Sequence, residues 1–379
     1  MQTSSWRGAA LVGAVLLVAM FVSLGAFAVR SGRAGDRFDF LRWEVSAFPN
    51  KWLDRLGAPL RDDPDPDEAL RRYFALDDRN SDEGRALENE VEAVIEGRVD
   101  AVLRELGAGW PLSPFGVWPP VDAELAGSPR VLVVSPRDRI ARLKTDTLRP
   151  DLTLTEAESL ERSTEAADAN RSALVVGTGG LSLYPAVVSN RDSYEETVDT
   201  VAHEWTHHYL SIYPLGRDYF RSDDVRTINE TVADLVGAEV GRIVVERWPL
   251  NPPSTPTPAA TPTATATASP PPLDFDATMR DLRTEVDGLL GAGRIEDAER
   301  RMEAVRLQLN AAGYRIRRIN QAYFAWYGTY AARGDSVDPL GGQLRDLRDR
   351  SGSLSSFLHA VRDATTRDDV AALLASRSG

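Results

Sequence analysis

The spacing of apolar residues predicts helices first and strands after them. Between residues 67 and 107, apolar side chains recur at steps of three and four, as they do along one face of a helix. They are Leu87, Val91, Ile95, Val99, Val102 and Leu106. Residues 130–136 (RVLVVSP) and 172–188 (SALVVGTGGLSLYPAVV) are β-branched runs interrupted by glycine and proline, which is typical of short strands.

The helical spacing returns after these strands. The stretch SYEETVDTVAHEWTHHYL begins with Ser193 and has Glu196 three residues later, a capping box that predicts a helix start. Residues 228–244 (INETVADLVGAEVGRIV) repeat the helical spacing. Beyond residue 273, two apolar stripes joined by Gly-Ala-Gly predict a helical hairpin, and residues 319–334 predict a further helical stretch with five aromatic residues. The fold class expected is therefore α+β with a helical C-terminal part.

Two segments fit neither pattern. Residues 9–29 form an uncharged apolar run of 21 residues, long enough to cross a bilayer as a helix. Residues 251–272 (NPPSTPTPAATPTATATASPPP) lack charge and large apolar side chains, which predicts a disordered spacer. The expected organisation is an N-terminal tail (1–8), a transmembrane anchor (9–29), a core with N-terminal helices (30–250), the spacer (251–272) and a helical region packed on the core (273–379).

The N-terminal run has a second interpretation and an ambiguous orientation. Ala26-Phe27-Ala28 resembles a signal-peptidase site, but the run exceeds the usual length of a signal-peptide core, which favours an uncleaved anchor. Arg30, Arg33 and Arg37 follow the run and would keep the chain in the cytoplasm. The Thr-Pro spacer is typical of exported stalks, and on that ground we expect the catalytic body outside the cytoplasmic membrane.

Composition narrows the chemistry. The 379 residues include 44 Lys and Arg against 57 Asp and Glu, a net charge of −13, which argues against nucleic acid as a partner. There is no cysteine, so a metal site would need histidine and carboxylate ligands. Nothing in the sequence points to a particular oligomeric state.

Three of the four histidines lie within six residues, at 203, 207 and 208. At about 100° per residue, His207 lies about 40° from His203 on the helix, so both imidazoles can reach one metal ion. Glu204 lies at about 100°, beside such an ion, where it can take a proton from a metal-activated water. His208 lies at about 140° and is expected to be a spectator. The alternative is an amphipathic surface helix that happens to carry histidines.

A second motif favours the metal site. His203-Glu204-Trp205-Thr206-His207 is followed, in the next predicted helix, by Asn229-Glu230-Thr231-Val232-Ala233-Asp234. This pair resembles the HExxH and NExxAD motifs of gluzincin metallopeptidases, the thermolysin-like clan, over roughly residues 172–245. The resemblance implies a zincin-like core and a Zn²⁺ ion held by His203, His207 and Glu230. It further implies that Glu204 is the general base and that Asp234 accepts a hydrogen bond from a ligand histidine.

The resemblance also suggests where substrate lies. Members of this clan commonly have a substrate-binding edge strand before the HExxH helix, and GGLSLYPAVV occupies that place here. Its first residues, Gly179, Gly180, Leu181, Ser182 and Leu183, are the candidates, although a plain core strand fits the pattern equally well. Tyr327 and Tyr330 are candidates for a hydroxyl that donates to the tetrahedral intermediate, while aromatic core packing is the alternative role.

The sequence thus predicts a membrane-anchored zinc metallopeptidase, a hydrolase whose substrate is a peptide or protein. The alternative is a non-catalytic cell-envelope binding protein with a structural zinc site. Three protein ligands and an intact Glu204 disfavour that alternative, because structural zinc normally has four protein ligands.

Overall fold

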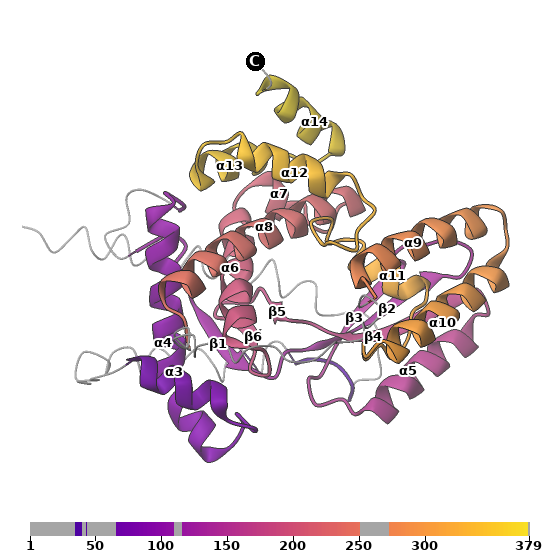
Figure 1. Ribbon diagram of the computed structural model, residues 1–379, viewed down its shortest axis with the longest axis horizontal. Helices are drawn as coiled ribbons and strands as arrows, with labels where there is room; N and C mark the ends of the chain where they lie inside the picture. Colours follow the sequence, from indigo (N-terminus) through magenta and orange to yellow (C-terminus); the bar gives the residue numbers. More distant parts are fainter. Residues whose placement is uncertain (1–34, 40–42, 44–65, 110–115, 251–272, 378–379) are drawn as a thin grey trace, which may run out of the picture.

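The computed structural model describes residues 35–39, 43, 66–109, 116–250 and 273–377 (Figure 1). The strands are β1 (Ala123–Ala126), β2 (Arg130–Pro136), β3 (Lys144–Leu148), β4 (Arg171–Gly177), β5 (Gly180–Leu181) and β6 (Ala186–Ser189). The helices are α3 (Pro66–Ala75), α4 (Asp82–Glu105), α5 (Leu154–Ala167), α6 (Tyr194–Leu210), α7 (Pro214–Arg217), α8 (Asp223–Arg247), α9 (Phe275–Gly291), α10 (Ile295–Ala311), α11 (Gln321–Tyr327), α12 (Leu340–Asp349), α13 (Leu354–Val361) and α14 (Arg367–Ser376). The expected α+β class is confirmed.

The chain packs around two main cores, which we call the first and the second lobe. The first lobe holds the sheet β1-β6-β5 with α3, α4, α6–α8 and α12–α14. In this sheet β6 is central, parallel to β1 and antiparallel to β5. The largest fully buried side chains of α6, Tyr194 and Trp205, point into this core.

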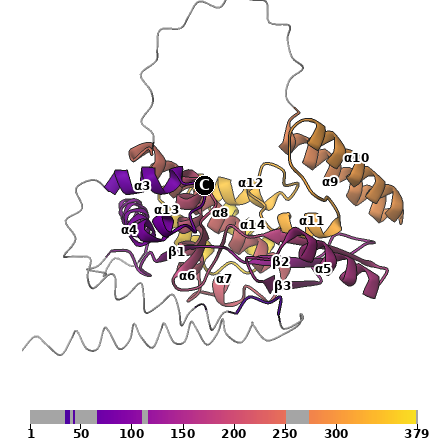
Figure 2. The same ribbon diagram turned by 90° about the horizontal axis from the view of Figure 1, so that it is seen from below.

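The second lobe is a layered arrangement around the antiparallel sheet β3-β2-β4. Alternate residues of β2 and β4 face opposite sides, as the two-residue period of a strand requires. Val131 and Val133 pack against α9, α10 and α11, whereas Leu132 and Val134 pack toward α5. Helix α5 therefore lies on one face of this sheet and α9–α11 on the other, and Figure 2 shows α9 and α10 above β2 and β3.

Glutamate side chains accept hydrogen bonds from backbone amides along one strand of each sheet. Glu96 and Glu92 of α4 accept hydrogen bonds from the Ala123 and Leu125 amides of β1, at 2.9 and 2.6 Å. Glu165 and Glu161 of α5 do the same for Ala173 and Val175 of β4, at 3.0 and 2.7 Å. These contacts cover the outer edges of β1 and β4, and the Phe38 amide donates to the Thr147 carbonyl at the edge of β3. Among the described residues, the outer edge of β5 has no such contact, and an open strand edge can accept another chain.

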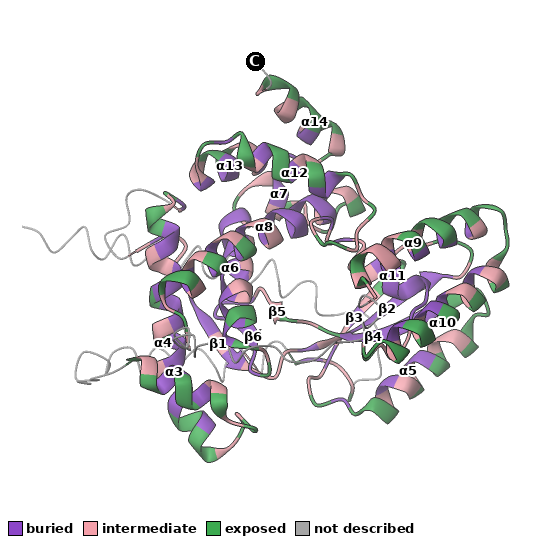
Figure 3. Ribbon diagram, in the orientation of Figure 1, coloured by how far each residue is buried: buried purple, intermediate pink, exposed green. Residues whose placement is uncertain are grey.

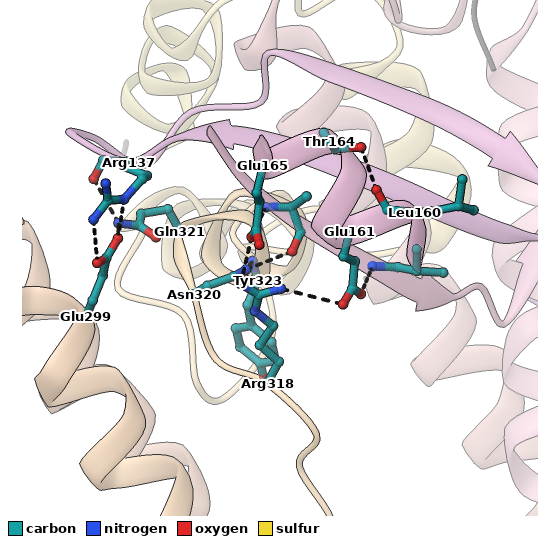
Figure 4. Close-up of polar contacts among 12 residues, drawn as sticks. Arg137, Leu160, Glu161, Thr164, Glu165, Glu299, Arg318, Asn320, Gln321 and Tyr323 are labelled. Carbon is teal, nitrogen blue, oxygen red and sulfur yellow. Dashed lines mark hydrogen bonds and ion pairs between the residues drawn. The ribbon is translucent and has the colours of Figure 1, made fainter. Parts of the chain in front are cut away.

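The segment before α11 fastens that helix to β4 (Figure 4). Arg318 pairs with Glu165 at 2.6 Å, and Asn320 donates from Nδ2 to the Ala173 carbonyl at 2.9 Å. The Asn320 Oδ1 atom also accepts from the Tyr323 amide and so caps α11. Helix α11 and the residues that follow it are therefore fixed to the second lobe.

Close packing of two helices places the two motifs side by side. Helices α6 and α8 pack against each other, and both contain many buried residues (Figure 3). A Cβ atom added at Gly237 would lie 2.8 Å from the Asp199 carbonyl oxygen, and one at Gly241 would lie 1.9 Å from the Asp199 Oδ1 atom. These glycines allow the backbones to approach closely, which brings His203 opposite the NExxAD residues.

Two predictions about element length were wrong. Residues 319–334 are not one helix, because α11 ends at Tyr327, with Gly328 as its C-cap, and Tyr330 lies beyond it. Residues 179–188 are not one strand either, because β5 and β6 are joined by a tight reversal that contains a cis Tyr184-Pro185 bond. Only Gly180 and Leu181 of the five candidate edge residues are in a strand.

Some predictions fall on residues that the structure does not describe. The expected anchor, residues 9–29, and the expected spacer, residues 251–272, both lie outside the described residues. Within the described ranges, no helix is long and apolar enough to cross a bilayer.

Candidate metal centre

The structure brings His203, His207 and Glu230 together. The two Nε2 atoms of the histidines are 3.0 Å apart, and the Glu230 Oε2 atom is 3.5 Å from that of His203 and 3.7 Å from that of His207. The histidines lie one turn apart on α6, and Glu230 comes from α8. All three side chains are buried or nearly so.

These three atoms have the separation that a zinc ion imposes on its ligands. Bonds of about 2.0–2.2 Å at tetrahedral angles put neighbouring ligand atoms about 3.3 Å apart. The three observed separations bracket that value. Two imidazole nitrogens and one carboxylate oxygen also form a donor set that zinc accepts and that leaves a fourth position open.

A hydrogen bond on the far side of each imidazole fixes its orientation. The His203 Nδ1 atom lies 3.1 Å from Asp234 Oδ1, and the His207 Nδ1 atom lies 2.7 Å from Asn229 Oδ1. When Nδ1 carries the hydrogen in each of these contacts, the Nε2 atom of a neutral ring presents its lone pair to the metal. The sequence assigned this role to Asp234, but it gave Asn229 no role.

The charges of the metal-free group show what a cation would replace. Burial lowers the pKa of His203, but hydrogen bonds with Asp234 and Glu230 outweigh it and hold that pKa well above its ordinary value. Burial lowers the pKa of His207, and the charge of His203 adds to this. These opposite directions favour a proton on His203 rather than on His207. Because two facing lone pairs at 3.0 Å would repel each other, the position requires either this proton or a cation.

Glu230 is ionised and uses its two oxygens differently. Burial raises its pKa, but His207, His203 and the Tyr219 hydroxyl together bring that pKa down to about 2. Oε2 faces the two histidines, whereas Oε1 accepts a hydrogen bond from the Tyr219 hydroxyl. Tyr219 lies between the two motifs in the connection from α7 to α8, and its ring meets that of His207 edge-on at 6.2 Å.

Sequence reasoning missed Tyr219 because only the folding of the α7 turn brings it back to the site. Asn229 fixes this turn by donating from Nδ2 to the Leu215 carbonyl at 3.1 Å. The one signal available in the sequence was a tyrosine between the two motifs, which has no fixed place without the turn.

Glu204 lies against the backbone of the edge strand. It is 5% exposed, and an added Cβ atom at Gly180 would lie 2.3 Å from its Oε1 atom. Burial raises the pKa of Glu204 to about 8; the neighbouring charge of Glu230 adds to the rise and that of His203 opposes it. A carboxylate with a pKa near neutrality, close to two candidate metal ligands, can both accept and return a proton.

The remaining candidates of the edge strand surround this contact. The Gly179 carbonyl accepts from the Ser189 amide at 2.8 Å, and an added Cβ atom at this glycine would lie within 3.6 Å of Thr200 on α6. Leu181 pairs with Val187 of β6, and Ser182 and Leu183 belong to the reversal that follows. Leu183 is buried, so its side chain belongs to the core rather than to a binding surface.

His208 has a structural contact of its own. Its Nε2 atom lies 2.6 Å from the Leu183 carbonyl oxygen, and its ring packs edge-on against Tyr184. Burial lowers its pKa to about 4, so the ring is neutral and donates this hydrogen bond. His208 is outside the metal-ligand group, as expected, but it ties α6 to the end of the edge strand.

Of the two candidate tyrosines, the structure brings only Tyr330 to the group. The amide of the next residue, Ala331, donates to the Thr231 hydroxyl beside Glu230 at 3.2 Å. Burial raises the pKa of the Tyr330 hydroxyl well above its ordinary value, and the charge of Glu230 adds to this rise, so the hydroxyl keeps its proton.

Tyr327 points elsewhere. It packs on Tyr323, with ring centroids 4.5 Å apart, and the Arg333 guanidinium lies over its ring. It lines a separate cavity that also contains Asp338 and Arg367. The reversal of the chain after Gly328 separates the two tyrosines, which one continuous helix would have kept together.

Comparison of the chain with models of known protein families, with curated proteins and with solved structures finds no match. The resemblance to gluzincins therefore depends on the two motifs and on the geometry that they adopt here.

Proposed function

We propose that this protein is a zinc-dependent peptidase of the gluzincin type, in which His203, His207 and Glu230 hold the metal. The observation that carries the proposal is the position of Glu204. Its carboxylate lies beside a three-ligand group and also against the backbone of an edge strand. A purely structural zinc site has no need of an ionisable group in that position.

Each residue has a chemical task in this proposal. When bound, zinc would supply Lewis acidity, which polarises a peptide carbonyl and lowers the pKa of a water molecule. Glu204 accepts a proton from water as the new C–O bond forms and passes it to the nitrogen as the C–N bond breaks. Ionised Glu204 is favoured beside a dication, so its pKa falls below the metal-free value of about 8.

Two tyrosine hydroxyls could stabilise the charge that develops on the substrate oxygen, Tyr330 directly and Tyr219 only by turning its single O–H from Glu230 Oε1 to the substrate. Burial raises the pKa of Tyr219 and of Tyr330 well above the ordinary value, so both remain donors at neutral pH. Tyr219 contacts Glu230 from the connection before α8, and the charge of Glu230 acts on Tyr330, which lies in the segment after α11. Donors fixed in a buried site contribute most where negative charge develops in the transition state.

We propose the outer edge of β5 as the binding site of the peptide backbone. Among the described strands, β5 pairs only with β6, so its other edge can accept an extended peptide as a further strand. A peptide there would lie beside Glu204. We retain with this proposal the anchoring through residues 9–29 and a catalytic body outside the cytoplasmic membrane.

The test separates metal binding from catalysis. Purified protein should contain close to one zinc per chain and should cleave members of a broad peptide library, read by mass spectrometry. Glu204→Gln keeps all three ligands, so zinc content should be unchanged while turnover falls by about 10² or more. Glu230→Ala should lose the metal. Full activity in Glu204→Gln, or tight zinc binding without cleavage of any peptide, would favour the structural-zinc alternative.

A further inference from the structure

Arg142 is a guanidinium near the candidate metal centre that has no carboxylate partner. It lies in the connection between β2 and β3 of the second lobe. Its Nη2 atom donates to the Thr329 hydroxyl at 2.9 Å, and its guanidinium lies over the Trp326 ring at 4.8 Å. Its Nε atom is buried and makes no hydrogen bond. Within the described residues, no carboxylate forms an ion pair with it.

The neighbouring arginines are different, because each has an acid. In the second lobe, Arg137 pairs with Glu299 at 2.7 Å and Arg317 with Glu161 at 2.5 Å. Arg226, which lies over the Tyr219 ring, pairs with Asp223 at 2.5 Å. Arg142 is half-buried, with its Nε atom fully covered, and a partly desolvated cation without a counter-ion is stabilised by an anion that arrives from outside.

The surroundings of Arg142 point toward the metal group. The groups that interact electrostatically with it are Tyr219, Arg226, Tyr330 and Glu230. Glu230 is the one acid among them, and its charge is taken up when a metal binds. With a dication in place, the positive charge near Arg142 increases, and the need for an added anion increases with it.

The guanidinium is also held in a fixed orientation. The Thr329 hydroxyl that accepts from Arg142 donates in turn to the Trp326 carbonyl. Trp326 belongs to α11, which is fastened to β4 through Asn320 (Figure 4). Arg142 is therefore preorganised, which reduces the entropy lost when a ligand binds.

We propose that Arg142 binds a carboxylate of the peptide substrate, so that the enzyme selects peptides with a carboxylate close to the bond that is cleaved. The planar guanidinium matches a carboxylate with two parallel hydrogen bonds. The carboxylate has two possible sources, the C-terminus of the peptide or the side chain of an acidic residue. This inference rests on the function proposed above.

Four versions of one peptide distinguish the sources. The peptide cleaved best in the library digest, or the one bound best where none is cleaved, is prepared with a free or an amidated C-terminus. Each form carries Glu or Gln at one position, next to the cleaved bond where there is one. For each version, kcat/KM is measured with the wild-type protein and with Arg142→Gln and Arg142→Lys. Arg139→Gln is the matched control, because Arg139 lies in the same connection with an exposed side chain paired to Asp138.

Binding gives a second measurement that needs no turnover. Fluorescence anisotropy of the same four peptides is recorded with zinc-loaded Glu204→Gln protein, with and without Arg142→Gln. In both kcat/KM and binding affinity, protein that keeps Arg142 should favour one carboxylate form of the peptide by about 30- to 100-fold. Arg142→Gln should remove this preference in both measurements. Arg142→Lys keeps the positive charge but loses the planar pair of hydrogen-bond donors, so it should retain part of the preference.

The results can show whether this inference or the peptidase proposal has failed. If no peptide is cleaved but binding still depends on the carboxylate and on Arg142, the peptidase proposal fails, while the carboxylate-binding role of Arg142 stands. The inference is overturned if wild-type protein treats all four peptides alike. It is also overturned if Arg142→Gln weakens all four equally, or if Arg139→Gln has the same effect.

Discussion

Replacing Gly180 with alanine tests whether the edge strand determines the position of Glu204. The added Cβ atom would lie 2.3 Å from the Glu204 Oε1 atom and 2.9 Å from its Cδ and Cγ atoms. Gly180 has no positive φ, so alanine itself fits the backbone, and the contact with Glu204 is the perturbation. Either the carboxylate or the strand must move.

The distances give the size of the movement. To restore a separation of about 3.4 Å, the Oε1 atom must retreat by roughly 1 Å from its present 2.3 Å. The end of a side chain can rotate away at a small cost in stability, so we expect the free energy of unfolding to change by no more than about 1 kcal/mol. A catalytic group displaced by about 1 Å can lose about 10² in rate. Activity should therefore fall much more than stability.

The assay compares two glycines of the same neighbourhood. Gly177, at the end of β4, also lacks a positive φ, and an added Cβ atom there meets nothing within 4 Å. Zinc content, thermal unfolding and kcat/KM are measured for Gly180→Ala and Gly177→Ala. We expect Gly177→Ala to match the wild type and Gly180→Ala to keep its zinc while losing about 10² in kcat/KM.

The pH profile identifies the cause of any loss. If Glu204 has moved, the lower pKa of the kcat/KM profile should shift, because its burial and its neighbouring charges change together. Equal activity of the two alanine variants would refute the reasoning. A loss of zinc in Gly180→Ala would refute it differently, since it would mean that the strand supports the metal ligands rather than Glu204.

Two further predictions concern the residues around the metal group. Asp234→Asn should weaken zinc affinity by about 10- to 100-fold through the loss of the charged acceptor at the His203 Nδ1 atom, measured by competition with a chromophoric chelator; an unchanged affinity would contradict this role. His208 has a pKa of about 4 in the folded protein against about 6.5 when unfolded, so the unfolded state binds more protons between these values and stability is lost as pH falls through this window. His208→Gln can still donate a hydrogen bond to the Leu183 carbonyl but cannot titrate. In urea unfolding of protein without metal, the free energy of unfolding of the wild type should fall between pH 7.5 and pH 4 by up to about 3 kcal/mol more than that of the variant. An equal fall in both proteins would contradict this prediction.

The grouping of His203, His207 and Glu230 was predictable because helix periodicity determines their relative positions. His203 and His207 are one turn apart on any helix, and the capping box at Ser193 fixed where that helix begins. Glu230 and Asp234 are likewise one turn apart on α8. The two helices then needed only to meet, which the close approach at Gly237 and Gly241 allows.

The positions of Tyr219, Tyr330 and Arg142 were not predictable, because each comes from a connection rather than from a regular element. Tyr330 was a candidate, but the predicted continuous helix through residues 319–334 could not distinguish it from Tyr327. The end of α11 at Tyr327 decides between them, and it depends on how the following residues contact Thr231. Arg142 belongs to no sequence motif. It stands out only in the structure, where nearby arginines such as Arg137 pair with a carboxylate and Arg142 donates to a hydroxyl instead.

Asn229 shows how a motif residue can link both kinds of position. Its Oδ1 atom lies 2.7 Å from His207 Nδ1, which orients a metal ligand, while its Nδ2 atom donates to the Leu215 carbonyl and fixes the turn that precedes Tyr219. The Tyr219 hydroxyl then returns to Glu230, the residue next to Asn229 in the chain. An amide suits this position because it offers an acceptor and a donor at once, whereas aspartate at neutral pH offers acceptors alone. The asparagine of the NExxAD motif therefore connects the orientation of the ligands with the placement of the hydroxyl beside them.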